Sequence, residues 1–298
     1  MKIGLLISTP TTPPTEALND AFDAKYQEMW GQSYSGLSIY WQNGVYGFGV
    51  DVSISNDGTR IAVVQSNYYR DLTAIARTFE FKNGSWMQIG DDILGGQGIG
   101  GEAYLDDFAG ITSVNLSGDG MTLAVGARLS NGNGIDDPVG GYKIGAVKIF
   151  YWDNNNSNWV QKGDRQLGFL NGGNESYLGG SLWYFGYSVS LNNNGTRIAI
   201  GAPTSSDKGC VFIRDWDSSQ EKWIDVWQTD YTNKGSSHIE GTTIFLTQDG
   251  QYLITSAPRQ DVDGTRHAGS AHIYRINSYN ESEAYEHVDG WYNIGRVK

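Results

Sequence analysis

Apolar and polar residues alternate with a period of two in several similar stretches of the chain. In the clearest stretch, 185–203, Val189 and Leu191 alternate with serines. An Asn-Gly pair follows, and Ile198 and Ile200 then resume the alternation. A period of two is typical of a strand with one buried face, and Asn-Gly is a preferred hairpin turn. The stretch therefore predicts a β-hairpin.

The same phrase occurs in three further copies, at 51–65, 113–127 and 243–258. These copies place Asp57-Gly58, Asp119-Gly120 and Asp249-Gly250 at the turn, where Asp and Gly suit the backbone geometry. Each hairpin is followed by another alternating strand and then by a segment that begins with tryptophan. The third strands are expected at 74–81, 145–152, 209–216 and 269–276, and the tryptophans are Trp86, Trp159, Trp223 and Trp291.

Tandem antiparallel units of this kind cannot bury both of their faces alone, whereas radial stacking hides the faces between neighbours. The sequence therefore predicts an all-β fold, a β-propeller of four-stranded antiparallel blades in a single domain, 1–298. The tryptophans are expected to pack between blades. The expected repeats are 46–107, 108–184, 185–238 and 239–298, with 1–45 as a degenerate or partial fifth blade that carries an insert.

Composition agrees with short strands joined by tight turns, because the chain has 40 Gly, 10 Trp and 18 Tyr. A formal net charge of −12 argues against binding to nucleic acid or anionic lipid, which both need clustered Lys and Arg. No apolar run approaches the roughly 18 residues of a spanning helix, and the N-terminus makes a poor signal peptide. The single cysteine, Cys210, excludes an intramolecular disulfide framework.

The stretch 185–216 resembles the FG-GAP repeat of the integrin-α type, in which Phe-Gly and Gly-Ala-Pro bracket the inner hairpin of each blade. The other copies match in part: the first has Phe48-Gly49 but reads VVQ for Gly-Ala-Pro, the second has Phe108-Ala109 and then GAR, and the last keeps only Ala257-Pro258. The resemblance implies adhesion or scaffolding without catalysis. It also implies seven blades in integrins, for which this chain is too short at its own repeat length.

Calcium loops of the integrin type carry closely spaced carboxylates, which are hard oxygen ligands. The chain holds no complete copy of that loop. The nearest fragments contain Asp261 and Asp263, and Asp136 and Asp137, each after the second strand of a repeat. A solvated acidic loop is the simpler explanation of both fragments, so no cofactor is expected and calcium is the alternative.

Catalytic motifs are missing from the sequence: no Gly-x-Ser-x-Gly elbow, no P-loop and no His-Glu-x-x-His pattern occurs. We therefore expect a non-enzymatic binding, adhesion or structural assembly module with a protein or glycan partner, at a cell surface, outside the cell or in a virion. Exposed aromatic residues in loops are candidate partner contacts, namely Tyr68, Tyr69, Trp183 and Tyr184. The alternatives are a carbohydrate-binding or glycoside-processing propeller with a site in the central funnel, and a piece of a larger propeller.

Overall fold

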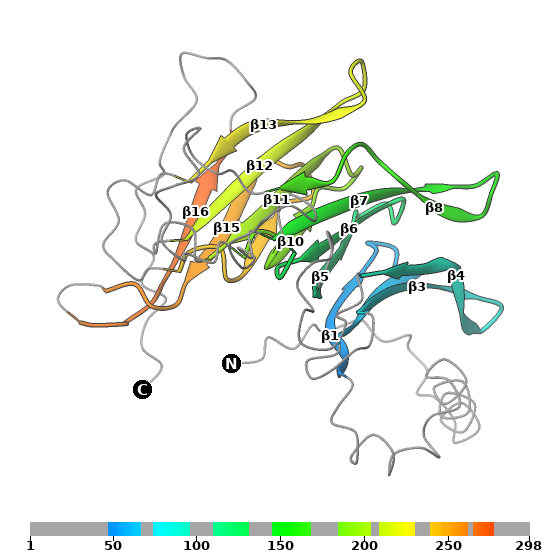
Figure 1. Ribbon diagram of the computed structural model, residues 1–298, viewed down its shortest axis with the longest axis horizontal. Coiled ribbons are helices and arrows are strands. Elements are labelled where there is room, and N and C mark those ends of the chain that lie inside the picture. Colours follow the sequence, from blue (N-terminus) through cyan, green and yellow to red (C-terminus); the bar gives the residue numbers. More distant parts are fainter. Residues whose placement is uncertain are drawn as a thin grey trace, which may run out of the picture.

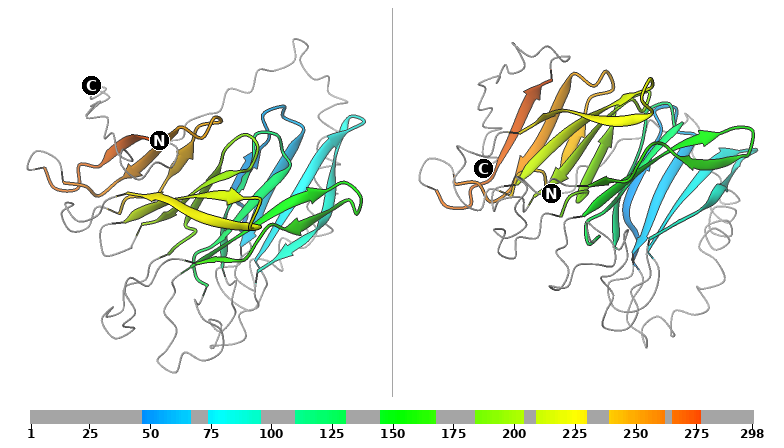
Figure 2. Two further views of the ribbon diagram at one scale, coloured as in Figure 1. Left: turned by 90° about the horizontal axis from the view of Figure 1, so that it is seen from above. Right: turned by 45° about the horizontal axis from the view of Figure 1, so that its top comes forward.

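The computed structural model describes residues 47–66, 74–95, 110–130, 145–167, 184–203, 209–229, 239–261 and 265–276. In these ranges every regular element is a β-strand, and the strands form four antiparallel sheets. We call the sheets the first to fourth blade in chain order. Figures 1 and 2 show them following one another from the first blade, in blue and cyan, to the fourth, in orange. The described part of the chain is therefore all-β, as predicted.

Each blade begins with the predicted inner hairpin. The first blade has the order β1 (Gly47–Ile54), β2 (Arg60–Ser66), β3 (Ile75–Lys82) and β4 (Ser85–Leu94). The second has β5 (Ile111–Leu116), β6 (Thr122–Ala127), β7 (Ala146–Asp153) and β8 (Asn158–Gln161), and β9 (Gln166–Leu167) also pairs with β7. The third has β10 (Ser188–Leu191), β11 (Arg197–Ala202), β12 (Cys210–Asp217) and β13 (Lys222–Gln228). The fourth has β14 (Ile244–Leu246), β15 (Tyr252–Ala257) and β16 (Ser270–Arg275).

The fourth blade differs from the expected four strands, because the described residues supply only three. Its predicted fourth strand, 291–297, lies outside the described residues, as does the predicted partial blade at 1–45. No strand of the first blade pairs with a strand of the fourth in the described part of the chain. The blade number, the repeat boundaries and ring closure therefore remain predictions.

The turns of the inner hairpins are closed by their own side chains. In the first blade, Asp57 Oδ1 accepts hydrogen bonds from the backbone N–H of Thr59 (2.9 Å) and from Ser55 Oγ (2.7 Å). Asp119 and Asp249 accept the same backbone bond in their own turns, at 2.9 and 3.0 Å. The repeated Asp is thus explained by turn geometry, as the sequence predicts.

The four turns meet at one end of the array. The backbone N–H of Asn56 donates to Gly118 O (2.8 Å), and Asn193 N donates to Gln248 O (2.9 Å). The Asn56 side chain also donates to Gln248 Oε1 at 3.1 Å, which joins the first blade to the fourth. These bonds bring residues far apart in the sequence to a common axis.

Side chains also link neighbouring inner strands along that axis. Ser53 Oγ accepts the backbone N–H of Leu116 (2.9 Å), and Ser190 Oγ accepts that of Leu246 (2.9 Å). Asn115, at the equivalent position of the second blade, binds Leu191 N at 2.8 Å. One polar residue in each of the first three repeats thus links its inner strand to the next one.

The apolar cores lie between neighbouring blades. Separate clusters of buried residues join the first blade to the second, the second to the third and the third to the fourth, through pairs such as Ala62 and Leu123, Val147 and Ile198, and Ile213 and Leu253. Two of the tryptophans span these interfaces, which confirms their predicted packing. Trp159 Nε1 donates to Thr78 Oγ1 (2.7 Å), and Trp223 Nε1 donates to Lys162 O (2.9 Å).

The outer faces of the first and last described blades expose apolar side chains. Val52 and Leu94 of the first blade are 64% and 59% exposed. On the fourth blade, Phe245, Ile254 and Ile273 stand opposite one another across β14, β15 and β16, and Phe245 is 52% exposed. In the interior of the array such faces are buried by the next blade.

A substitution at Gly186 tests how closely the third blade approaches the second. Its φ is +82°, and a Cβ there would lie 2.6 Å from the backbone oxygen of Ala146. We expect Gly186→Ala to lower the free energy of unfolding by about 2–5 kcal/mol, from backbone strain plus the forced separation of the blades. Gly58→Ala has a φ of +72° but an open Cβ position, so it should lose only about 1–2 kcal/mol. Urea denaturation measures both; equal losses would show that the blades do not approach this closely.

Candidate functional site

A cavity of about 410 Å³ lies where the four inner strands begin, away from the turns. We call it the central funnel. The same position of each repeat faces it, and this position is occupied in turn by Val50, Thr112, Tyr187 and Thr242. Residues that follow it in the four strands complete the wall, together with Arg128. The funnel is therefore built from one repeated position whose side chain varies.

In the first two blades, irregular strand pairing accompanies this position. The pairing of β1 with β2 shifts register between Phe48 and Asp51, and that of β5 with β6 shifts between Ile111 and Ser113. Such bulges take residues out of the ladder and re-aim their side chains. The second blade leaves out Thr112, and the first leaves out Gly49 and Val50, where the φ of +81° at Gly49 suits glycine.

Arg128 follows directly on β6, at the position that Pro203 holds after β11 in the third blade. Its guanidinium carbon lies 5.1 Å from the ring centre of Tyr187 and 5.8 Å from that of Tyr184. Both distances fit cation–π contacts. The Nε atom of Arg128 is buried and has no hydrogen-bond partner among the described residues. Arg128 thus holds an unused donor at the funnel wall.

Tyr184 is fixed in an unusual backbone conformation. Its φ is +50°, which is uncommon for a bulky residue. A tight turn, in which Tyr187 N donates to Tyr184 O at 2.9 Å, holds this conformation and brings both tyrosines to Arg128. The conformation therefore positions the arginine.

Asp51 and Thr112 supply the other polar groups of interest. Burial raises the pKa of the Asp51 carboxyl above its ordinary value, against the lowering effect of bonds from Val114 N (2.8 Å) and Val52 N (3.0 Å). Thr112 Oγ1 is buried and lacks a hydrogen-bond partner in the described part of the chain. Together with Arg128 Nε, Thr112 Oγ1 is thus one of two buried polar atoms of the funnel residues that have no hydrogen-bond partner among the described residues.

The described funnel wall contains few charged side chains. Among the residues that line it, Asp51 and Arg128 are the charged ones. Hydrolysis of glycosides commonly uses two carboxyl groups on either side of the scissile bond. The described funnel wall offers one carboxyl, and both of its oxygens accept backbone hydrogen bonds.

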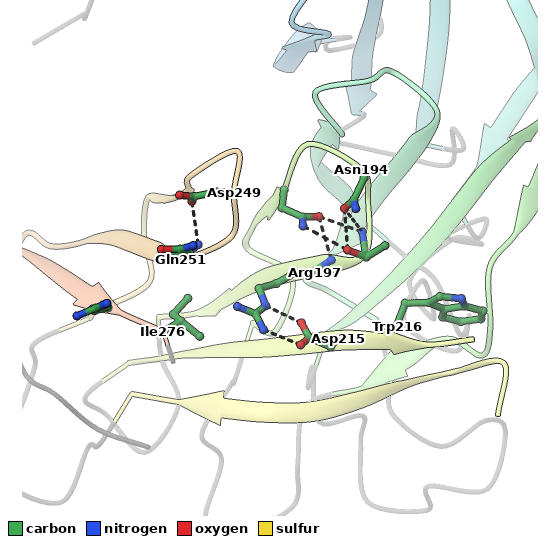
Figure 3. Close-up of a pocket in the computed structure, with 10 residues that line it drawn as sticks. Asn194, Arg197, Asp215, Trp216, Asp249, Gln251 and Ile276 are labelled. Carbon is green, nitrogen blue, oxygen red and sulfur yellow. Dashed lines mark hydrogen bonds and ion pairs between the residues drawn. The ribbon is translucent and has the colours of Figure 1, made fainter. Parts of the chain in front are cut away.

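A second cavity, of about 560 Å³, lies between the third and fourth blades near the turns (Figure 3). Several of its polar groups are already paired: Arg197 binds Asp215 through two bonds of 2.6 Å and donates to Gly250 O at 2.8 Å. Ile276 lines this cavity at the repeat position that Trp152 occupies in the second blade. The cavity is therefore explained by a smaller residue at a blade interface, and the central funnel is the better candidate site.

Of the partner-contact and calcium residues predicted from the sequence, the structure describes Tyr184 and Asp261. Tyr184 is described and contacts Arg128, whereas Tyr68, Tyr69 and Trp183 lie outside the described residues. Asp261 is exposed, and its Oδ1 accepts the backbone N–H of His267 at 2.6 Å. The other proposed calcium ligands, Asp136, Asp137 and Asp263, lie outside the described residues, so the calcium alternative stays a prediction.

Within the described ranges, no three His, Cys, Asp or Glu side chains gather as a metal site would require. The same ranges contain no helix long and apolar enough to cross a membrane.

The funnel residues Arg128, Thr112 and Asp51 were not identified from the sequence. The one available signal was the change from Gly-Ala-Pro to GAR in the second copy, which places a charge where the third and fourth copies have proline.

No protein-family model matches the sequence, and no curated protein matches it. Solved structures with some likeness include a candidate 6-phosphogluconolactonase from Bacteroides uniformis, with a TM-score of 0.43 and 12% identity over 78% of this chain and 68% of that one. The β-propeller domain of the Trilobed protease from Pyrococcus furiosus has a TM-score of 0.37 and 12% identity over 75% of this chain and 52% of that one.

A structure from a study of two prolyl endopeptidases has a TM-score of 0.40 and 11% identity, over 79% of this chain and 27% of that one. Likenesses this low carry no argument about function. The description of the fold rests on the sheets themselves, which form an all-β, propeller-like array.

Thr112 and Ser113 give a matched test of the funnel wall. Thr112→Val removes a hydroxyl that has no partner, so the free energy of unfolding should stay the same or rise by up to about 1 kcal/mol. Ser113→Ala removes a buried bond of 2.8 Å to Gly186 O and should lower it by about 1 kcal/mol. Thermal and urea denaturation measure both variants. A clear loss of stability in Thr112→Val would mean that the hydroxyl is already bonded within the protein.

Proposed function

We propose that the protein is a non-enzymatic binding module of the β-propeller type that takes a ligand in its central funnel. One observation carries the proposal: Arg128 Nε and Thr112 Oγ1 are buried at the funnel wall without partners among the described residues. Buried polar atoms left unsatisfied cost free energy, and such exceptions call for an explanation. A bound ligand would supply the missing hydrogen bonds. The funnel volume, about 410 Å³, falls within the roughly 300–1,000 Å³ of small-molecule sites.

A carbohydrate ligand fits this wall because the aromatic Tyr187 lines it together with the hydroxyl-bearing Thr112 and Thr242. The proposal therefore keeps the binding half of the carbohydrate alternative and leaves out hydrolysis. Adhesion or assembly at a cell or virion surface, through a protein or glycan partner, would be the biological use of such a module. That use remains a prediction from the sequence.

A binding screen combined with activity assays tests the proposed function. Saturation-transfer NMR of the purified protein with a mixed library of mono- and disaccharides should detect at least one ligand. Assays with chromogenic glycosides should detect no turnover. Turnover that Asp51→Asn abolishes would contradict the proposal, and so would the absence of every ligand signal.

We further propose that the array belongs to the FG-GAP type and is closed by a fifth blade from residues 1–45. Support comes from the exposed apolar faces of the first and fourth blades and from Phe48-Gly49, which starts the first blade as Phe185-Gly186 starts the third. Gly145 of the second blade bridges to Phe185 of the third. A preceding blade would bridge to Phe48 in the same way.

Gly49→Ala tests the fifth blade. The φ at Gly49 is +81°, and the described structure leaves its Cβ position open. If a further blade packs there, the alanine should lower the free energy of unfolding by about 2–5 kcal/mol, as a close backbone approach would at Gly186. A loss of only about 1–2 kcal/mol, the strain term alone, would show that no blade approaches Gly49. Urea denaturation of the full chain makes the measurement.

A further inference from the structure

We propose that the central funnel recognises a singly charged carboxylate on a small hydroxylated molecule, such as a sugar acid, with Arg128 as the anchor. The inference rests on the proposed ligand-binding function and adds the chemical class of the ligand. It depends on the orientation of Arg128, on the balance of charge in the funnel and on the hydroxyl groups beside it.

The ring contacts of Arg128 engage the face of its guanidinium and leave its N–H groups without a partner among the described residues. Tyr184 and Tyr187 lie against the guanidinium, with ring centres 5.8 and 5.1 Å from its central carbon. Ring contacts of this kind hold the group in place without using its N–H donors. Its Nε is buried and has no partner in the described residues. A carboxylate binds two N–H groups of a guanidinium side by side, a geometry that lysine cannot offer.

The funnel charge favours a carboxylate over a phosphate. Asp51 lines the same cavity as Arg128, so the two side chains nearly cancel when both are ionised. A ligand with one negative charge gains the contact to Arg128 against limited repulsion from Asp51. A phosphate monoester carries close to two charges near neutral pH and meets more repulsion, in a chain whose net charge is already −12.

The rest of the wall fits a hydroxylated body. Thr112 Oγ1 has no partner among the described residues. Thr242 Oγ1 donates to Ile239 O at 2.8 Å, and its lone pairs remain able to accept. Val50 and Tyr187 provide apolar surface between these polar groups. A sugar ring presents this combination of hydroxyl edges and apolar C–H faces.

Calorimetric titrations with D-glucuronate, D-glucose and D-glucose 6-phosphate test the inference. The wild-type protein should bind glucuronate about tenfold or more tightly than glucose, because a hydrogen bond to a charged group contributes about 1.5–3 kcal/mol. It should also bind glucuronate more tightly than glucose 6-phosphate. Equal binding of glucuronate and glucose, or tighter binding of the phosphate, overturns the inference without any variant.

Variants then identify the anchor. Arg128→Gln should weaken glucuronate binding by about tenfold or more and leave glucose binding nearly unchanged. Arg128→Lys keeps the charge but loses the paired geometry, so it should fall between the two. Arg266→Gln removes an exposed arginine outside the funnel and should bind as the wild type does. A folded Arg128→Gln protein with undiminished glucuronate binding overturns the inference.

The outcomes separate the inference from the proposed function. If the saccharide library yields a neutral ligand while glucuronate does not bind, the carboxylate inference fails and the binding function stands. If no saccharide binds, both fail.

Discussion

The close approach of neighbouring inner strands is the constraint on which the structure depends. Each strand reaches the next through a side-chain acceptor, as Ser53 reaches Leu116 and Ser190 reaches Leu246, both at 2.9 Å. At the end of the strands, the turns meet through backbone bonds such as Asn193 N to Gln248 O. The linking residues are short and polar in the first three blades, where a further described blade follows. The hairpin sequence recurs along the chain because each inner hairpin has to meet this packing requirement.

One position of each repeat, at the start of the inner strand, is outside this constraint. Where the inner strands begin, bulges in the first two blades interrupt the ladder, and in all four blades the residue at this position lines the funnel. The residue type at this position differs from blade to blade: it is Val50, Thr112, Tyr187 and Thr242 in turn. Substitutions at this position can therefore alter the funnel while the blades keep their packing.

Local patterns were sufficient to predict the strands, because alternation and Asp-Gly or Asn-Gly turns act within a few residues. The inner hairpins and the third strands lie close to where the sequence placed them. The fourth sheet has one strand fewer than expected within the described residues. The site was harder to predict. Arg128 meets Tyr184 and Tyr187 across some 56 residues, and only the folded array brings them together.

Asp51 is a second residue whose environment could not be predicted from the sequence. Its position is held by Ser113 in the second blade and Ser188 in the third, and the sequence alone gives no reason to single it out. Burial and the bond to Val114 N, which define its environment, come from the neighbouring blade. The loop setting of Tyr184 predicts a partner contact, and the structure adds its contact with Arg128, which the sequence does not indicate.

The most direct measurement is a high-resolution crystal structure of the protein soaked with D-glucuronate. The account predicts the ligand in the central funnel, with its carboxylate on Arg128 Nε and a hydroxyl on Thr112 Oγ1. An empty funnel in which Arg128 has turned to pair with Asp51, or a ligand bound elsewhere on the array, would contradict it.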